Sequence, residues 1–325
     1  MKKTKTHILY IILFILLTIS LYCVFIRKLY LTSVLNRKSG FFSMFFFTLN
    51  HAIYAKENHL NFKIDSSDWL FKFKHGWTDY FEPYELSNQI QLLPKVKQYP
   101  ETLKDYSIHE YRKIIPYVYK YNKSTEKIIQ SARKTLNLTD MYDSIFIRRG
   151  DKIISGESRN WGVEKYIDLL FVVNPLANKV YIQTDDYSVI EELNTYLEKI
   201  NKRLDIKTLC DESQRGVIVF NTYKNVGIHV PKGKKEEEYV EKNKTHYAKN
   251  KSVEEMTPNE IYDHTITMIT GIDIVCKSDV CICDYESNVG RFIKLFHNDS
   301  SKVYNILDPD NDIDYSKKIC PAFSF

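Results

Sequence analysis

The arrangement of apolar and polar residues along this 325-residue chain changes near residue 140. Upstream, apolar residues gather in long runs, whereas from Tyr142 onward short apolar stretches alternate with amphipathic ones. The short apolar stretches predict strands, and the amphipathic stretches predict helices. The predicted strands are 144–147, 179–183, 206–209, 217–220 and 280–283, and the predicted helices are 163–173, 188–201 and 288–296. This alternation predicts a parallel sheet with helices on both of its faces.

The longest apolar run covers residues 8–26 and contains no charged residue. At a rise of about 1.5 Å per residue, a helix of this length comes close to the roughly 30 Å core of a bilayer. The run is long for the apolar part of a cleavable signal peptide, and no small-x-small cleavage site follows it. It therefore predicts one N-terminal transmembrane helix, preceded by a short tail at 1–7.

Basic residues flank this run on both sides, so the positive-inside rule gives a nearly even balance. They are Lys2, Lys3 and Lys5 before the run and Arg27, Lys28, Arg37 and Lys38 after it. We expect a cytoplasmic tail and a lumenal main body, as in a type II signal-anchored membrane protein of the ER or Golgi. Asn-x-Ser/Thr sequons at Asn122, Asn137, Asn243, Asn250 and Asn298 give mild support to a lumenal glycoprotein.

The remainder of the chain divides into a stem and two lobes. Residues 27–39 are interpreted as the stem, and residues 40–140 as an N-terminal α/β lobe that opens with a Phe-rich helix at 40–55. Residues 141–325 are interpreted as a Rossmann-like lobe. Within that lobe, 232–260 is highly charged and lacks apolar periodicity, which predicts a surface insertion bordering a binding site.

Composition and charge narrow the classes of function. Charged residues make up 27% of the chain and the net charge is +5. This balance does not predict nucleic-acid binding, which usually comes with a basic stripe or a pI above about 9. It does allow an anionic small molecule to bind. Outside the 8–26 run the chain has five cysteines, an odd number that cannot all pair within one chain, and buried free thiols are the simpler interpretation.

Three predicted strands end in polar loops, and in open parallel sheets ligands bind beyond the carboxyl ends of the strands. After 144–147 come Arg148 and Arg149, whose guanidinium groups suit a diphosphate, and Gly150, which permits close backbone approach. An Arg–Asp surface pair is the alternative. The same loop reaches Glu157, a carboxylate near a lysine as a general base requires, or simply a solvated side chain.

The other two strand exits are also polar. Asp185 and Asp186 are adjacent carboxylates that could bind a metal, hold a ribose or cap the next helix. The third exit leads through Ser287 into a helix that carries Arg291, where a phosphate site and a simple N-cap are both possible. Residues 308–314 alternate Asp as in a calcium loop, but an isoleucine replaces the glycine of the sharp turn. We expect a solvated loop there and no metal site.

At these same places the chain resembles the α-1,6-fucosyltransferases, which include N-glycan core fucosyltransferases and rhizobial enzymes that fucosylate chitin oligosaccharides. Residues 146–152, Phe-Ile-Arg-Arg-Gly-Asp-Lys, are similar to the family motif His-Val-Arg-Arg-Thr-Asp-Lys. Residues 180–186, Val-Tyr-Ile-Gln-Thr-Asp-Asp, are similar to Tyr-Leu-Ala-Thr-Asp-Asp, and 278–291 are similar to Ala-Asp-Phe-Leu-Val-Cys-Thr-Phe-Ser-Ser-Gln-Val-Cys-Arg. Upstream, 68–69 and 76–83 look like the family's Asn-Trp and Gly-Trp-Glu-Thr-Val-Phe-Arg-Pro.

The resemblance implies a GT-B-like α/β fold of two lobes, with GDP-fucose as donor substrate in the Rossmann-like C-terminal lobe, no cofactor and no required metal. By position, it implies that Arg148 holds the donor diphosphate with help from Ser287. The remaining donor-site positions that it implies are Arg149, Asp185, Asp273, Tyr285, Asn288 and Arg291. It implies Asp151, Lys152 and Glu157 as catalytic positions, with Glu157 matched to the base once one inserted residue is allowed.

Three positions depart from the family pattern. Phe146 stands where the family has His before the arginine pair, and Glu286 stands where it has the first Ser of a pair near the phosphate. The family aspartate that binds guanine lies eight residues before the Ala-Asp pair, whereas Asp273 lies six before Asp279, on a different helix face. These departures bear most on the identity of the donor nucleotide.

We therefore expect a membrane-anchored inverting fucosyltransferase that transfers fucose from GDP-fucose to a glycan acceptor. Arg148 and the helix that begins at Asn288 would neutralise charge on the departing diphosphate. Glu157 would take the acceptor proton and Lys152 would orient it. The alternatives are the same fold with a different nucleotide-sugar donor and a non-catalytic membrane protein that binds glycans or nucleotides.

Overall fold

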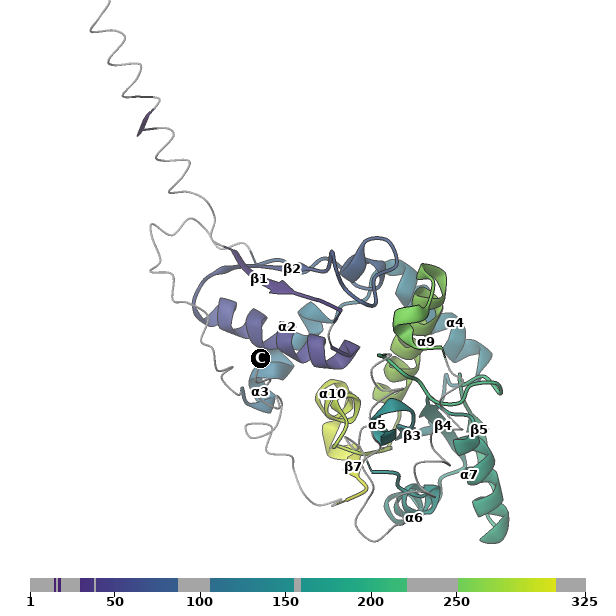
Figure 1. Ribbon diagram of the computed structural model, residues 1–325. Coiled ribbons are helices and arrows are strands. Elements are labelled where there is room, and N and C mark those ends of the chain that lie inside the picture. The colour runs from purple at the N-terminus through teal and green to yellow at the C-terminus, as the bar shows by residue number, and fades with distance from the viewer. Residues whose placement is uncertain are drawn as a thin grey trace, which may run out of the picture.

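The computed structural model describes residues 15, 17–18, 30–37, 39–86, 106–154, 159–220 and 251–307. Two parallel sheets organise this part of the chain (Figure 1). The first sheet pairs β1 (Tyr30–Val34) with β2 (Asn61–Asp65). The second contains β3 (Asp143–Ile147), β4 (Lys179–Thr184), β5 (Asp205–Lys207), β6 (Cys281–Cys283) and β7 (Val303–Asn305). The protein is therefore α/β, as the strand and helix alternation predicted.

The strand order of the larger sheet is β5-β4-β3-β6-β7, with every pair parallel. Numbered from its first strand, this is the order 3-2-1-4-5 of a doubly wound Rossmann-like sheet, whose direction of winding reverses between β3 and β6. The predicted strand at 217–220 is wrong, because these residues run as irregular backbone past the ends of β3 and β4. The sheet thus contains its topological switch point at β3 and β6.

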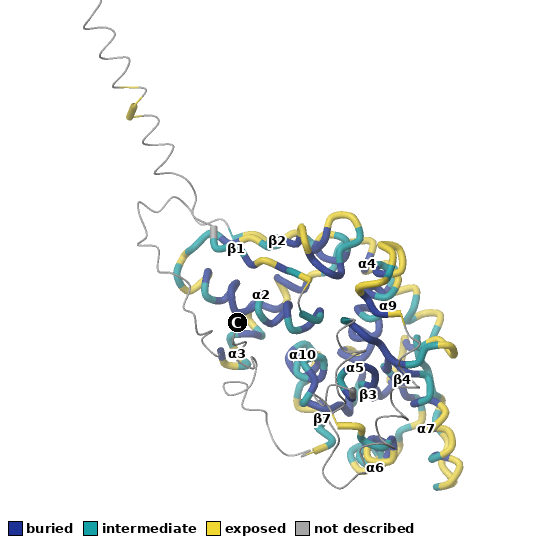
Figure 2. Tube along the Cα trace, in the orientation of Figure 1, coloured by how far each residue is buried: buried dark blue, intermediate teal, exposed yellow. Residues whose placement is uncertain are grey.

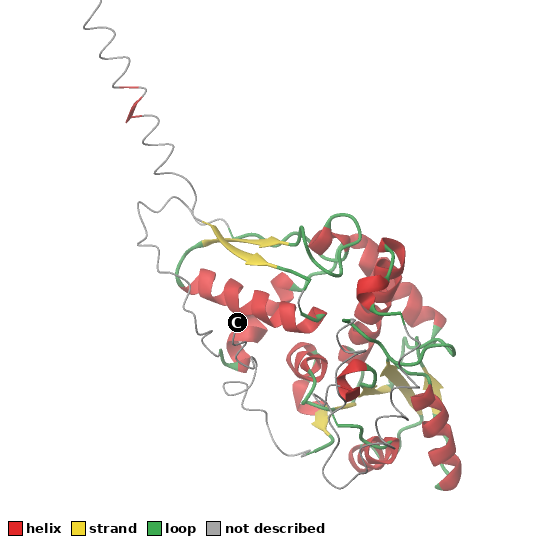
Figure 3. Cartoon of the chain, in the orientation of Figure 1, coloured by secondary structure: helices red, strands yellow, loops and turns green. Residues whose placement is uncertain are grey.

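Helices cover both faces of this sheet (Figure 3). Their bounds are α4 (Lys123–Thr135), α5 (Asp151–Ile154), α6 (Val163–Val173), α7 (Ser188–Lys199), α9 (Pro258–Cys276) and α10 (Asn288–Phe296). All five residues of β3 are buried, and their side chains alternate between the faces. Ile145 and Ile147 join a core with α6 and α7, whereas Phe146 joins the core formed with α9 and α10. Figure 2 shows these central strands as buried between helices whose outer sides are exposed.

The N-terminal unit is built around α2 (Phe41–Glu57), which connects the parallel strands β1 and β2. The phenylalanines of α2 are mostly buried, as the Phe-rich pattern predicted. Ser33 of β1 bonds both Thr48 Oγ1 at 3.1 Å and His51 Nδ1 at 3.0 Å, which ties the strand to the helix. Residues 30–34 therefore belong to this unit, and their assignment to a stem was wrong.

The two units share one hydrophobic core. Phe42 and Phe45 of α2 lie 4.8 and 5.3 Å, between ring centroids, from Phe292 of α10. Tyr119, which follows α3 (Ile108–Val118), lies 4.8 Å from the same ring. Burying a phenylalanine is worth about 1.5–3 kcal/mol, so these contacts fix α10 firmly against the N-terminal unit. The position of the N-terminus of α10 consequently depends on both units.

Three sequence interpretations fall wholly or partly outside the described residues. Of the predicted anchor at 8–26, only residues 15, 17 and 18 are described, and within the described ranges no helix is both long and apolar enough to cross a membrane. The Asp-rich loop at 308–314 is not described. Of the predicted insertion, 251–260 instead form a 3₁₀ helix at Val253–Glu255 and the first turn of α9. The helix α9 itself was not predicted.

Candidate functional site

The candidate site lies at the switch point, beyond the carboxyl ends of β3 and β6. These strands pair with Ser144 opposite Cys281 and Ile145 opposite Ile282. Extending this parallel register by two residues sets Ile147 beside Asp284. The Arg148–Arg149 loop and the loop that leads into α10 therefore leave the sheet next to each other, as a switch-point site requires.

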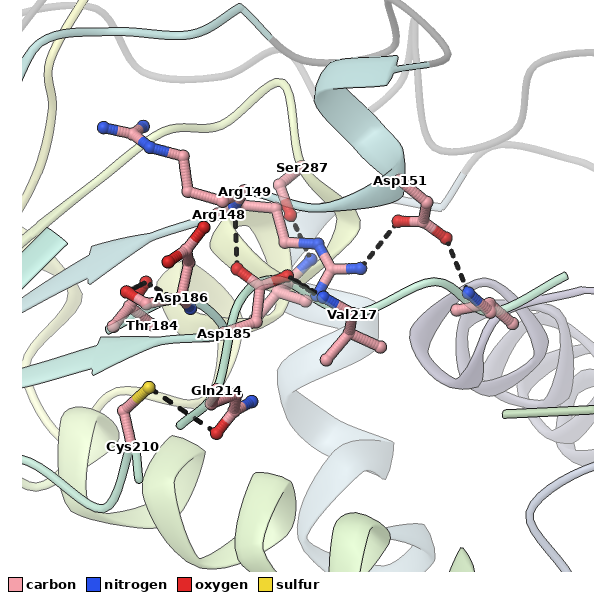
Figure 4. A network of polar contacts seen from close by, with 12 residues as sticks. Arg148, Arg149, Asp151, Thr184, Asp185, Asp186, Cys210, Gln214, Val217 and Ser287 are labelled. Atoms are coloured by element: carbon pink, nitrogen blue, oxygen red, sulfur yellow. Dashed lines mark hydrogen bonds and ion pairs between the residues drawn. The ribbon is translucent and has the colours of Figure 1, made fainter. Parts of the chain in front are cut away.

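Arg148 is held between two buried carboxylates (Figure 4). Its Nη1 lies 2.9 Å from Oδ2 of Asp185, and its Nη2 lies 2.9 Å from Oδ1 of Asp151. The side chain of Asp151 has no exposed surface, and that of Arg148 is 18% exposed. The two ion pairs thus fix the orientation of the guanidinium group at the mouth of the switch point.

The same carboxylates bind the backbone of neighbouring segments. Asp185 accepts hydrogen bonds from the backbone N–H of Arg149 at 2.7 Å and of Val217 at 3.3 Å. Asp151 accepts one from Val219 N–H at 3.1 Å through its second oxygen. Burial raises the pKa of Asp185, and the charge of Arg148 opposes this effect. Both oxygens of Asp151 are engaged and buried, so in this structure it holds Arg148 and the 217–219 segment in position.

Gly150 is needed for a reason that differs from the predicted one. It has a φ of +65°, and a Cβ at this position would overlap the backbone of Val217. The left-handed conformation and the close approach of Val217 both favour glycine. The sequence had suggested that a ligand approaches this backbone, whereas here the neighbour is the 217–219 segment.

Arg149 does not share the environment of Arg148. Its Nη2 lies 3.4 Å from Oε2 of Glu192, a half-exposed residue of α7, and its side chain is only 4% exposed. Its Nη1 has no hydrogen-bond partner among the described residues. Burial and the nearby Asp284 raise the pKa of Tyr166, whereas Arg149 lowers it, so both groups lie near this tyrosine. An unpaired buried donor thus lies beside the β6 exit.

The N-terminus of α10 is formed by Ser287, whose Oγ accepts a hydrogen bond from Val289 N–H at 3.1 Å. The N-cap interpretation of Ser287 is therefore confirmed. Gly290, in the first turn, packs so closely on the carbonyl of Asp284 that a Cβ would overlap it. The first turn of the helix consequently sits directly on the end of β6, which aims its positive dipole end at the switch point.

Three other predicted donor-site residues hold this loop in shape. Arg291 donates from Nε to the carbonyl of Tyr285 at 2.9 Å and from Nη1 to Oδ1 of Asn288 at 3.3 Å. The Tyr285 hydroxyl donates to the carbonyl of Val303 at 2.8 Å and is buried. In this structure their contacts are with the protein itself, so Tyr285, Asn288 and Arg291 lie at the site and shape it.

Acidic groups also line this exit. Burial is the main reason that the pKa of Asp284 rises to about 6. Oε1 of Glu286 lies 3.5 Å from Nε of Arg159, while its Oε2 is buried and has no partner in the described ranges. The Arg159 guanidinium also lies 5.3 Å from the centre of the Trp161 ring. The site therefore combines cationic donors with carboxylates, rather than being uniformly basic.

The second exit divides its two carboxylates between two roles. Asp185 binds Arg148 as described, whereas Asp186, which precedes the N-cap Tyr187 of α7, accepts a hydrogen bond from Ser188 N–H at 3.0 Å. Nearby, Cys210 lies 3.5 Å from Gln214 Oε1, and burial raises the pKa of this thiol to about 12. In the described part of the chain, no group of three or more His, Cys, Asp or Glu side chains is placed to hold a metal ion.

Asp273 is not brought to this site. It lies near the C-terminal end of α9 and forms an ion pair of 2.9 Å with Lys277. The neighbouring Ile274 carbonyl accepts a hydrogen bond from the Tyr142 hydroxyl, at the amino end of β3. The five residues of β3, at about 3.3 Å each, separate this end from Arg148 by roughly 16 Å. The prediction that Asp273 contributes to the same binding site is therefore not supported by its position.

The predicted base and its neighbour are described only in part. Glu157 lies outside the described residues, and Lys152 is half-buried in α5. One residue that the sequence did not single out is His264 of α9, which is half-buried. Burial and the charge of Arg148 lower the pKa of His264 to about 4, so a neutral imidazole lies near the guanidinium. The Thr257-Pro258 start of α9, with Glu260 completing a capping box, was the signal that could have located it.

Comparisons with known proteins give a structural likeness alone. No protein-family profile and no curated protein sequence matches the chain. A crystal structure of NodZ α-1,6-fucosyltransferase soaked with GDP-fucose aligns with a TM-score of 0.52 and 10% identity, covering 88% of this chain and 98% of that one. The fucosyltransferase NodZ from Bradyrhizobium aligns with a TM-score of 0.51, 10% identity and coverage of 88% and 97%. The chain therefore has a NodZ-like fucosyltransferase fold.

Proposed function

We propose that this chain is a glycosyltransferase that transfers fucose from GDP-fucose to a glycan acceptor in a single inverting displacement. The observation that carries this proposal is the meeting of two arginines and the N-terminus of α10 at the switch point of a Rossmann-like sheet. Such a crevice is where nucleotides bind in doubly wound sheets. The NodZ structures, one of them soaked with GDP-fucose, share the fold and add support.

In this proposal the diphosphate lies between the arginines and α10. Arg149 offers a buried N–H without a partner among the described residues, and a buried donor of this kind calls for a ligand. Arg148 is oriented in advance by Asp151 and Asp185, so little reorganisation is needed as charge develops on the leaving group. Asp185 acts here through Arg148 rather than on the nucleotide.

The acceptor side of the proposal rests on the motif resemblance. Glu157 would take the proton of the acceptor hydroxyl, with Lys152 orienting it. The transfer would use no metal ion and no cofactor, because the arginines and the helix N-terminus supply the positive charge. Residues 8–26 would anchor the enzyme in the membrane with the catalytic part on the lumenal side.

A different nucleotide sugar is the alternative donor, and Glu286 favours it. Its Oε2 is buried without a described partner, and it stands where the resembling family has a serine. A free carboxylate oxygen suits the hydroxyls of a donor sugar, so donor choice should depend on this residue. The test is donor hydrolysis with GDP-fucose, GDP-mannose, UDP-galactose and UDP-N-acetylglucosamine, for the wild type, Glu286→Ser and the surface control Glu198→Gln.

We expect the wild type to hydrolyse GDP-fucose fastest and Glu286→Ser to change the ranking of the donors, whereas Glu198→Gln leaves it unchanged. If the wild type prefers a UDP-sugar, the donor is not GDP-fucose, but the conclusion that the protein is a glycosyltransferase stands. Tight GDP binding without turnover of any donor or acceptor would instead favour the non-catalytic binding protein.

The affinity for the nucleotide sugar should fall as the pH rises through about 6, where Asp284 ionises. Below that pH the carboxyl is neutral, and above it a carboxylate lies near the bound diphosphate and repels it. An interaction of about 1 kcal/mol gives a roughly fivefold loss between pH 5 and 7.5. The probe is GDP-fucose, because its diphosphate is esterified at both ends and does not titrate in this range. Calorimetric titration should give an affinity for GDP-fucose that does not change with pH in the Asp284→Asn variant. The surface variant Asp205→Asn should show the same pH dependence of affinity as the wild type.

A further inference from the structure

A pocket of about 450 Å³ lies where α3 and the loop after it meet the C-terminal ends of α9 and α10. This volume falls within the range of about 300–1,000 Å³ that is typical of small-molecule sites. The pocket is at the amino edge of the sheet, beside Asp273, whereas Arg148 lies at the carboxyl edge. None of its lining residues belongs to the network around Arg148.

Four side chains that line this pocket carry buried polar atoms with no hydrogen-bond partner in the described structure. These atoms are Nε of Arg112, the hydroxyls of Tyr119 and Tyr121, and Oδ1 of Asp273, whose other oxygen pairs with Lys277. The two hydroxyls lie close enough to interact with each other, yet neither makes a well-formed hydrogen bond. Buried polar groups are nearly always paired, so a cluster of such atoms around one pocket points to a ligand.

The charges and the aromatic rings of the pocket define the chemistry of that ligand. Asp273 is balanced by Lys277, whose Nζ lies 2.9 Å from Oδ2, so a charged ligand is not required to neutralise it. The unpaired atoms include an N–H donor, one carboxylate oxygen and two phenol groups, and a ligand hydroxyl both donates and accepts. The half-buried ring of Tyr121 also supplies surface against which the apolar face of a sugar can pack.

We propose that this pocket binds an uncharged monosaccharide or disaccharide unit, at a site separate from the nucleotide crevice. The proposal does not rest on the proposed function, because it concerns binding at the other edge of the sheet. It gives Asp273, which the sequence had assigned to the nucleotide, a role in saccharide recognition. Arg112 and the two tyrosine hydroxyls complete the hydrogen bonds to the sugar.

The test is saturation-transfer NMR on the full chain with glucose, galactose, mannose, N-acetylglucosamine and lactose as probes, each with and without excess GDP. Tyr121→Phe is the main variant, because it removes a single oxygen atom that no described group bonds and so should fold as the wild type does. Asp273→Asn is the second variant. Tyr117→Phe is the matched control, since Tyr117 lies in the last turn of α3, close to Tyr121 in sequence, but is 64% exposed and does not line the pocket.

We expect at least one saccharide to show transfer that GDP does not displace. Tyr121→Phe and Asp273→Asn should each weaken its binding at least tenfold, and Tyr117→Phe should leave the binding unchanged. The proposal is overturned if no saccharide binds, if GDP displaces the saccharide, or if the folded variants bind it as the wild type does. Binding of glycine or inorganic sulfate in place of every sugar would also overturn it, because the ligand would then be charged.

Discussion

Replacing Arg148 by alanine should lower the free energy of unfolding by about 3–5 kcal/mol, the usual cost of breaking a buried ion pair by removing one partner. Asp151 and Asp185 would both be left buried without their counter-ion. Donor binding should be lost as well, because these carboxylates anchor the 217–219 segment at the site. Urea denaturation at pH 7.5 measures the first effect. Arg203→Ala, a change on the exposed surface, should stay within about 0.5 kcal/mol of the wild type.

The same variant has a pH signature that separates lost charge from lost packing. Burial already raises the pKa of Asp185, and Arg148 opposes this effect, so the pKa rises further when the arginine is removed. As the pH falls through that raised value, the folded variant takes up a proton that the unfolded chain does not. Its deficit in unfolding free energy should therefore shrink between pH 7.5 and 5. A deficit that is constant across this range would show that the guanidinium stabilises the fold by packing alone.

The sheet could be predicted because the positions of strands and helices depend mainly on the pattern of apolar and polar residues within each short segment. The apolar stretches at 144–147, 179–183 and 280–283 became β3, β4 and β6, and the polar loops after them reached the same edge of the sheet. Parallel pairing makes this convergence a geometric consequence of the strand and helix alternation. The position of the site, including Ser287 as the N-cap of α10, could therefore be predicted.

The partners of each side chain could not be predicted in this way. Arg148 and Arg149 are adjacent in sequence, yet their side chains have different partners. Arg148 is enclosed by two carboxylates, whereas Arg149 contacts Glu192 through Nη2 and has a buried Nη1 without a partner among the described residues. That difference depends on tertiary packing, because Asp185 follows β4 whereas Glu192 belongs to α7. The 217–219 segment, which resembled a strand in isolation, bonds the two carboxylates around Arg148. Asp273 was placed by its spacing in a motif, but the C-terminal end of α9 carries it to the opposite edge of the sheet.

Replacing Arg149 by methionine should reduce affinity for GDP by about 100-fold while leaving stability nearly unchanged. Hydrogen bonds from a charged donor contribute about 1.5–3 kcal/mol each, and a loss of 2.8 kcal/mol corresponds to about 100-fold. The variant leaves no buried charge behind, since its ion-pair partner Glu192 is 49% exposed and can be solvated. The melting temperature should therefore stay within about 2 °C of the wild type.

Isothermal titration with GDP and a thermal melt on the same sample check both parts. The matched control is Glu192→Gln, which removes the partner of Nη2 and leaves the unpaired Nη1 in place, so its GDP affinity should stay within about twofold. If Arg149 were only structural, Arg149→Met and Glu192→Gln would both lower the melting temperature and leave affinity intact. If a folded Arg149→Met variant binds GDP as tightly as the wild type, the diphosphate does not bind at this arginine. Because the Arg148 variant is expected to lose stability and the Arg149 variant to lose affinity, the pair tests whether adjacent guanidinium groups divide positioning and binding between them.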